Sequence, residues 1–266
     1  MILALDGLRV RAMVRRQAYV QRRAPQRWFD LFVWPMVDTV IWGSIGAFVA
    51  QQGGADRSAT PYMLSGILLM HVVYQSNVSM ATGFMDETWS RNLLNLMVSP
   101  LREIELLASL IITSLVRLVI GLGAVALAAW GLYAFDVTSA GPGLIPVVAV
   151  LMLVGWCIAL IVIGLILRYG SGAEILTWGI LFIAIALSGA FYPVDALPAV
   201  LRPLSEVLPS THAFEAARTL LDGDPMPWDQ MAAAAVGLVV CIPLAIAFLL
   251  RMLHLFRARG YVTRYS

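Results

Sequence analysis

Long apolar runs are the feature that most constrains how this chain can fold. The segment LIPVVAVLMLVGWCIALIVIGLIL, residues 144–167, contains no charged residue, and comparable runs recur along the sequence. A helix needs about 20 apolar residues to cross a bilayer core of about 30 Å. With 60% hydrophobic and 13% charged residues, the composition is also far from that of a soluble domain. We therefore expect an all-α integral membrane protein.

Apolar length predicts six transmembrane helices, and we treat residues 1–266 as a single transmembrane domain. The expected spans are residues 31–50, 62–84, 106–133, 144–167, 175–191 and 231–250. An even number of spans places both termini on the same side of the membrane.

The distribution of arginine predicts which side that is. All 18 basic residues are arginine, and fourteen of them lie in the two terminal segments or in loops on the side of the termini. Arg57, Arg202 and Arg218 fall on the other side, and Arg117 falls within a span. Because positive charge is retained in the cytoplasm, we expect a multi-pass protein of the bacterial cytoplasmic (inner) membrane with both termini cytoplasmic.

The basic N-terminal segment, residues 1–28, is helix-compatible from residue 6 to residue 24, where Pro25 follows. We expect an interfacial helix near anionic lipid headgroups, with Trp28 and Phe29 as anchors. The alternative is a charge cluster that only sets topology. The segment lacks an early apolar stretch with a small-residue cleavage site, so we expect no removable signal peptide. Residues 251–266 form a second cytoplasmic segment, the tail.

The loop MDETWSRNLLNLMVSPLREIELL predicts a short cytoplasmic helix over residues 85–100. Asp86 or Thr88 is expected to cap it, and Pro100 to close it. Its apolar residues recur at helical spacing, which suits docking into a groove on another protein. The alternative is a helix that rests on the membrane surface. The residues expected to make the docking contact are Asp86, Glu87, Trp89, Arg91, Asn92, Leu93, Leu96 and Met97.

The chain shows no catalytic, cofactor-binding or metal-ligating pattern. A phosphate-binding P-loop requires a lysine, and this sequence contains none. Cys157 and Cys241 lie in apolar runs and read as small buried hydrophobes rather than metal ligands. The three histidines are scattered. ATP-driven work would therefore need a separate ATPase subunit.

Three charged residues lie in or at the edge of the expected spans. Arg117 is about twelve residues into the third span and should have either a partner or a water-filled site. Asp38 is about seven residues into the first span from the same side, and we hypothesise an Arg117–Asp38 pair. Glu174 is a competing partner, and snorkelling of Arg117 to the interface is the alternative to pairing.

The stretch LSGAFYPVDALPAVLRPLSEVLPSTHAFEAAR, residues 187–218, begins as a span and then becomes proline-spaced and half-polar. Pro198 and Pro203 are each expected to start a short helix, and a second helix should follow Pro209 with Ser210 or Thr211 as its cap and Gly223 as its stop. The expected short helices are too short to cross the membrane and too apolar to form a solvated loop. We expect a re-entrant hairpin over residues 192–224 on the extracellular side, before the last span.

These two stretches, together with the order of spans, resemble the ABC-2 family of ABC-exporter permeases over nearly the whole chain. The resemblance implies that residues 85–100 form a coupling helix that docks on a cytoplasmic ATPase. It also implies an extracellular re-entrant gate, whose expected residues are Tyr192, Pro193, Asp195, Pro198, Pro209, Thr211, His212, Phe214 and Arg218. The implied partners are two ABC ATPase subunits, which carry the ATP and Mg²⁺, a second copy of the chain and membrane lipids. We expect no nucleic-acid partner.

The substrate is expected to be a lipid, drug or other hydrophobic small molecule, because the chain lacks a large extracellular domain that would bind a peptide or protein. Export of a lipid-linked polysaccharide is the close alternative, since aromatic side chains could stack on sugar rings. Trp28, Trp34, Trp42 and Trp130 lie near span ends, however, and are equally expected as interfacial anchors. Two rival classes are an ion-coupled secondary transporter or channel and a membrane scaffold without transport. The ion-coupled class would require acidic residues aligned at mid-membrane.

Overall fold

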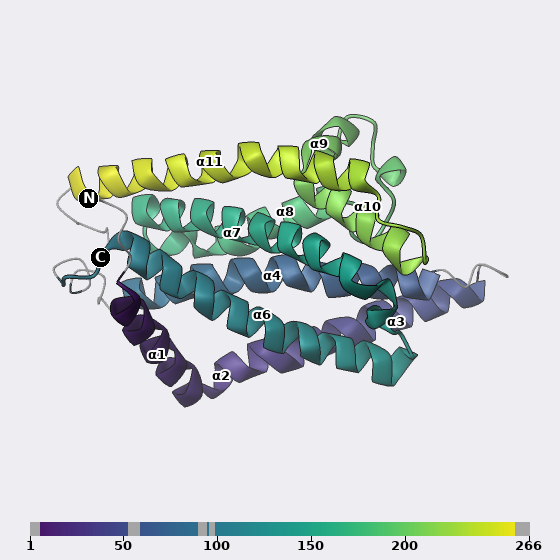
Figure 1. The fold of residues 1–266 in the computed structure, drawn as a ribbon, viewed down its shortest axis with the longest axis horizontal. Helices are drawn as coiled ribbons and strands as arrows, with labels where there is room; N and C mark the ends of the chain where they lie inside the picture. The colour runs from purple at the N-terminus through teal and green to yellow at the C-terminus, as the bar shows by residue number, and fades with distance from the viewer. Residues whose placement is uncertain (1–5, 53–58, 90–94, 96–98, 259–266) are drawn as a thin grey trace.

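The computed structural model describes residues 6–52, 59–89, 95 and 99–258. Every regular element in this part of the chain is helical, and the long helices lie side by side along one axis as an elongated bundle (Figure 1). The elements are α1 (Gly7–Arg23), α2 (Pro25–Trp28), η1 (Phe29–Val33), α3 (Trp34–Gln52), α4 (Ala59–Trp89), α6 (Glu103–Tyr133), η2 (Val137–Gly143), α7 (Leu144–Tyr169), η3 (Ser171–Glu174), α8 (Ile175–Leu187), η4 (Val194–Ala196), α9 (Arg202–Val207), α10 (Pro209–Leu221) and α11 (Trp228–Ala258).

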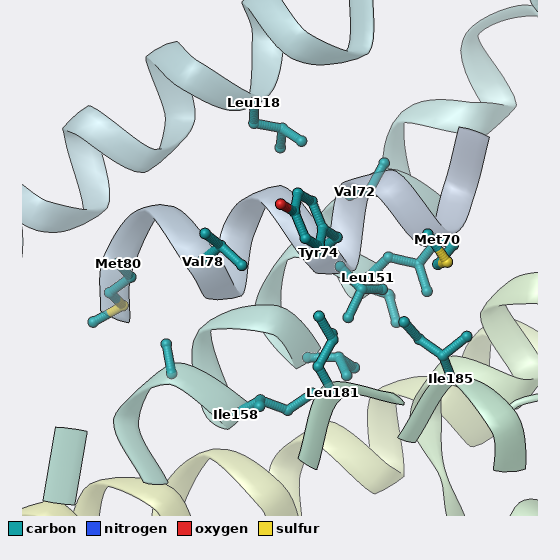
Figure 2. Packing of buried hydrophobic residues seen from close by; sticks show 14 of the residues in the cluster. Met70, Val72, Tyr74, Val78, Met80, Leu118, Leu151, Ile158, Leu181 and Ile185 are labelled. Carbon is teal, nitrogen blue, oxygen red and sulfur yellow. The ribbon is translucent and has the colours of Figure 1, made fainter. Parts of the chain in front are cut away.

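Helix α4 forms the centre of the bundle. It contacts α3, α6, α7 and α8, and its residues from Leu64 to Ala81 are buried. Figure 2 shows Tyr74 and Val78 of α4 among Leu118 of α6, Leu151 of α7 and the α8 side chains Leu181 and Ile185. An apolar layer therefore surrounds α4 on several sides.

Helices α4 and α7 approach each other closely at Gly155. A β-carbon at Gly155 would lie 2.6 Å from the carbonyl oxygen of Val73 and 2.7 Å from the β-carbon of Ser76. Only a residue without a side chain allows the two backbones to come this near. Gly155 thus fixes how α7 sits on the central helix.

Each of the six predicted apolar segments is helical. Judged by length and composition alone, four helical stretches of the described residues could cross a membrane: Pro25–Gln52, Ile104–Tyr133, Val137–Tyr169 and Trp228–Ala258. Helix α4 has 31 residues, but polar side chains along it lower its hydropathy. Helix α8 has only 13 residues and ends at Leu187, four residues before the predicted end of its span. The chain turns there because Gly189 adopts a left-handed conformation, with φ of 65°.

Helix α1 and the C-terminal end of α11 lie at the same end of the bundle, on the left in Figure 1. We call this the arginine-rich end, because α1, α2 and the last turns of α7 and α11 carry ten of the described arginines there. At the opposite end lie α10 and the first turns of α7 and α11. Predicted helix formation between residue 6 and Pro25 is confirmed by α1, which Asp6 caps by accepting a hydrogen bond from the Leu8 amide at 2.9 Å.

The predicted start of a separate helix at Asp86 or Thr88 is wrong. Helix α4 continues without interruption through both residues to Trp89, so neither acts as an N-cap. Short polar residues favour caps only when the preceding chain is not already helical. Half of the predicted 85–100 helix, residues 90–94 and 96–98, lies outside the described residues, and with it Arg91, Asn92, Leu93, Leu96 and Met97.

Candidate functional site

The arginine-rich end contains a group of charged side chains where α1 packs against α6. The backbone amide of Asp6 donates to the carboxylate of Glu105 at 3.1 Å, and the Arg102 amide donates to the same carboxylate at 2.8 Å. Arg9 reaches across to the carbonyl of Pro100 at 2.6 Å. Helix α1 is thereby joined to the segment that closes the predicted docking loop.

Two of the predicted docking residues are engaged within the chain. Arg27 of α2 pairs with Asp86 at 2.6 Å, and Arg16 of α1 pairs with Glu87, whose side chain is buried. Both pairs are charge-assisted hydrogen bonds, which are the stronger kind. Any partner that docks beside the end of α4 would therefore meet α1 and α2 as well as the docking loop.

The predicted Arg117–Asp38 pair is wrong. No ion pair between described residues joins Arg117 to Asp38 or to Glu174. Asp38 is half-buried on α3, and Glu174 belongs to η3 at the start of α8. Position along a helix gives the depth of a side chain, but the direction in which it points depends on the rotation of the helix about its axis.

Arg117 instead lines a cavity of about 230 Å³ between α1, α4 and α6. Asp86, Glu87 and the two arginines that pair with them line the same cavity. The cavity gives Arg117 polar neighbours, and the expected water-filled site stays a prediction. The side chain is only 8% exposed.

A row of buried polar residues on α4 escaped the sequence analysis. Gln75 donates to Ser79 at 2.8 Å, and Asn77 donates to the Thr177 carbonyl of α8 at 3.2 Å. Ser114 of α6 donates to the Ser76 carbonyl at 3.3 Å and accepts from the Trp156 indole of α7 at 3.1 Å. The signal was the polar sequence HVVYQSNVS inside an apolar run. These bonds hold four helices together around a polar strip.

The opposite end of the bundle is built from α8, η4, α9 and α10. Helix α8 starts beside the end of α7, and Leu220 of α10 packs 3.0 Å from where a β-carbon at Gly143 would lie, just before α7 begins. Helices α8 and α10 together therefore cover the length that α7 covers alone. This arrangement explains why α8 is so short.

The segment between α8 and α10 leaves the bundle and returns to the same level. Ser188, directly after α8, hydrogen-bonds Ser210 at 2.5 Å, and Ser205 of α9 donates to the Leu187 carbonyl at 2.5 Å. Pro209 packs against α11 at Gly237, well inside the bundle end. The geometry is that of a chain that re-enters at Pro209.

The expected helix starts in this region are partly corrected. Pro203 lies in the first turn of α9 and Gly223, with φ of 91°, ends α10, both as predicted. Pro198 begins a turn rather than a helix. Leu208 is the N-cap of α10, with Pro209 as its first residue, so Ser210 and Thr211 are not caps; Ser210 bonds to Ser188 instead.

Most of the predicted gate residues make internal contacts. Tyr192 donates to the Ala186 carbonyl at 2.5 Å, and His212 bridges the Glu206 carbonyl and the Gln230 side chain. Phe214 and Thr211 are buried. Pro193 precedes η4, which includes Asp195, whose carbonyl accepts from Arg202 at 2.6 Å.

Arg218 makes the most extensive set of these contacts. Its guanidinium donates to the carbonyls of Gly189 and Ala190 at 2.5 and 2.8 Å and lies 4.0 Å from the centre of the Tyr62 ring. The residue thus joins α10 to α4 and to the turn after α8.

An apolar cavity of about 470 Å³ lies between α7, α8 and α11, next to the start of α10. Ser210 is the main polar residue in its lining, and both cysteines, Cys157 and Cys241, face it. Among the described residues, no group of three or more His, Cys, Asp or Glu side chains could hold a metal ion. The lining of this cavity offers mainly hydrophobic contact.

Comparison with protein-family models identifies a family. The family model described as ABC-2 type transporter matches residues 9–221, from the first turns of α1 to the end of α10. The match includes both the 85–100 segment and the re-entering segment. A comparison with curated proteins found no match.

Proposed function

The chain belongs to the ABC-2 type transporter family, and on that premise we propose that it is the permease subunit of an ATP-driven exporter that forms its pathway as a dimer. The family makes it a membrane-spanning transport component of an ABC transporter rather than a catalytic one. The proposal adds the direction of transport, the pairing of two copies and the identity of the moving parts.

ATP binding and hydrolysis belong, in this proposal, to two separate cytoplasmic ATPase subunits that carry ATP and Mg²⁺. The absence of lysine from the sequence supports it, because a P-loop needs that residue. The 85–100 segment is proposed to dock on the ATPase. The ion pairs of Asp86 with α2 and of Glu87 with α1 support a rigid-body coupling, in which movement at the docking segment is passed to α4 and α1 together.

We propose six membrane crossings with the arginine-rich end in the cytoplasm. The crossings are α3, α4, α6, α7, α8 with α10, and α11. The charge difference between the two ends supports this orientation. The segment over residues 192–224 is then an extracellular gate, which would part as the dimer interface opens.

Helices α3 and α8 are proposed to line the interface between two copies. Large apolar side chains on both are exposed, including Ile41 at 47% and Phe182 at 56%. Both residues can be tested by crosslinking after replacement of the two native cysteines by alanine. We expect Ile41→Cys or Phe182→Cys to trap a dimer, and Val239→Cys on the equally exposed α11 not to do so. Failure of the first two variants in a labelled, folded sample would contradict the interface.

The proposed substrate is a lipid, drug or other hydrophobic small molecule. The observation that carries this choice is the apolar cavity of about 470 Å³, whose lining offers almost no polar group for a sugar. A lipid-linked polysaccharide remains the second candidate, favoured by the exposed tryptophans Trp34 and Trp228.

Reconstitution with the partner ATPase tests the proposal. We expect the ATPase to copurify with the chain and ATP-dependent transport of hydrophobic fluorescent probes in proteoliposomes. Transport of a probe by the chain alone, driven by an ion gradient, would instead support a secondary transporter. If a stable complex with the ATPase transports only polyprenyl-linked glycans, the proposed substrate is wrong, but the proposed role as an exporter permease stands.

A further inference from the structure

The cavity of about 230 Å³ beside Arg117 has the properties of an anion site. It lies between α1, α2, the last turns of α4 and the middle of α6, so that residues far apart in sequence surround one small space. Three arginines and two carboxylates line it. Glu87 pairs with Arg16 and Asp86 pairs with Arg27, and no ion pair within 4.0 Å between described residues includes Arg117.

Arg117 is over nine-tenths buried, with a side chain 8% exposed, and its Nε has no hydrogen-bond partner. Leaving a buried charge without a partner is costly, and the cost is larger than for a neutral group. An ion of opposite charge in the cavity would remove that cost. This residue supplies the first argument for a bound anion.

The unpaired polar atoms around the cavity give a second argument. The side-chain nitrogens of Gln17 and Gln21, both lining residues, are also buried without a partner. All three unpaired atoms are therefore N–H donors. A ligand that satisfies them must bring several acceptor oxygens close together, as a phosphate group does.

The position of the cavity indicates where the phosphate comes from. The exposed rings of Trp28 and Phe29 lie directly after α1, and the exposed Arg11, Arg15, Arg22 and Arg23 place that helix among charged groups. These are the marks of a helix at the level of lipid headgroups. Phosphate is the most abundant anion at that level of a bilayer.

We propose that this cavity binds the phosphate group of one anionic membrane lipid, held by Arg117 together with Gln17 and Gln21. The bound headgroup would join α1 to α4 and α6, next to the segment over residues 85–100. The lipid at this site would stay bound to the protein, so the proposal does not depend on which molecule is transported.

Native mass spectrometry of the full chain, purified in mild detergent, tests the proposal. We would add dioleoylphosphatidylglycerol, dioleoylphosphatidylcholine or inorganic phosphate at equal ionic strength and follow both bound mass and thermal unfolding. One tightly retained phosphatidylglycerol, with a higher unfolding temperature, is the expected result. Stabilisation by inorganic phosphate without lipid retention would overturn the lipid as the source, and a cavity that binds neither would overturn the site.

Three variants test whether lipid binding depends on the cavity or only on the positive charge of the protein surface. Arg117→Gln removes the buried charge, and Gln21→Glu places a carboxylate in the cavity from the surface helix, where folding is less at risk. Each should weaken retention of phosphatidylglycerol about tenfold or more, since a hydrogen bond to a charged group contributes at least that much. Arg22→Gln removes an equal charge from an exposed position outside the cavity and should retain the lipid. Equal loss in Arg22→Gln would overturn the proposal.

Discussion

Arg218 is the residue on which the position of α10 most depends. Its guanidinium satisfies two carbonyls in the turn that follows α8 and stacks on Tyr62 at the start of α4. Carbonyls at such a turn have no helical partner, so a side-chain donor replaces one. A planar group with several donors suits this task better than a flexible ammonium.

The substitution Arg218→Gln should therefore destabilise the protein by about 1–3 kcal/mol, because buried carbonyls lose their donor. Arg218→Lys should have an intermediate effect, since it keeps the charge but loses the stacked plane. Unfolding temperature in detergent is the measurement. The matched control is Glu215→Gln on the exposed face of the same helix. Equal shifts in both variants would show that Arg218 does not hold α10 in place.

At the scale of elements, α7 depends on its close approach to α4. Gly155→Ala would place a β-carbon 2.6 Å from a backbone oxygen of α4, so the two helices would have to separate. A cost of about 1–3 kcal/mol is expected from overpacking of this kind. Gly123→Ala on α6 has no heavy atom within 4 Å and should be neutral or slightly stabilising, because alanine favours helix. Chemical or thermal unfolding of the two variants checks the difference.

Helix α1 is held to the bundle by charge, and this attachment can be reversed. Glu87→Arg would face Arg16 with a like charge, and α1 should then detach more often. Trypsin cleavage within residues 7–23 measures this, because trypsin cuts after arginine. We expect cleavage about tenfold faster, since 1.4 kcal/mol corresponds to a factor of ten and an ion pair with a buried partner contributes about that much. The double variant Arg16→Glu with Glu87→Arg should restore slow cleavage; a double variant as fast as the single one would contradict the pairing.

The sequence predicted helices well and contacts poorly, for a physical reason. Apolar length alone requires helices in a bilayer, and all six apolar segments are helical. The Arg117–Asp38 pair failed because equal depth does not make two side chains face each other. The cap at Asp86 failed because a long helix can continue through a residue that favours caps. The pairs of Asp86 with α2 and of Glu87 with α1 could not be predicted, since they join segments about sixty to seventy residues apart.

At the scale of the whole molecule, the division of one crossing between α8 and α10 decides the topology. If α8 and α10 together form the fifth crossing, the chain crosses an even number of times and the arginine-rich end stays on one side. If the segment returned to the side from which α8 started, the last helix would have the opposite direction, and α11 could not finish at the same end of the bundle as α1, as it does in Figure 1. The bundle geometry therefore favours six crossings.

Labelling of single cysteines tests this topology in cells, after Cys157 and Cys241 are replaced by alanine. Asp224 and Ser139 are exposed at the opposite end of the bundle, and Arg22 is exposed on α1. We expect a membrane-impermeant maleimide to label Asp224→Cys and Ser139→Cys in intact cells, because that end would face outward, and to label Arg22→Cys only after permeabilisation. Labelling of Ser139→Cys but not Asp224→Cys from outside would mean that α8 and α10 do not complete a crossing. Labelling of Arg22→Cys in intact cells would show that the arginine-rich end faces outward. The proposed docking segment would then not be cytoplasmic.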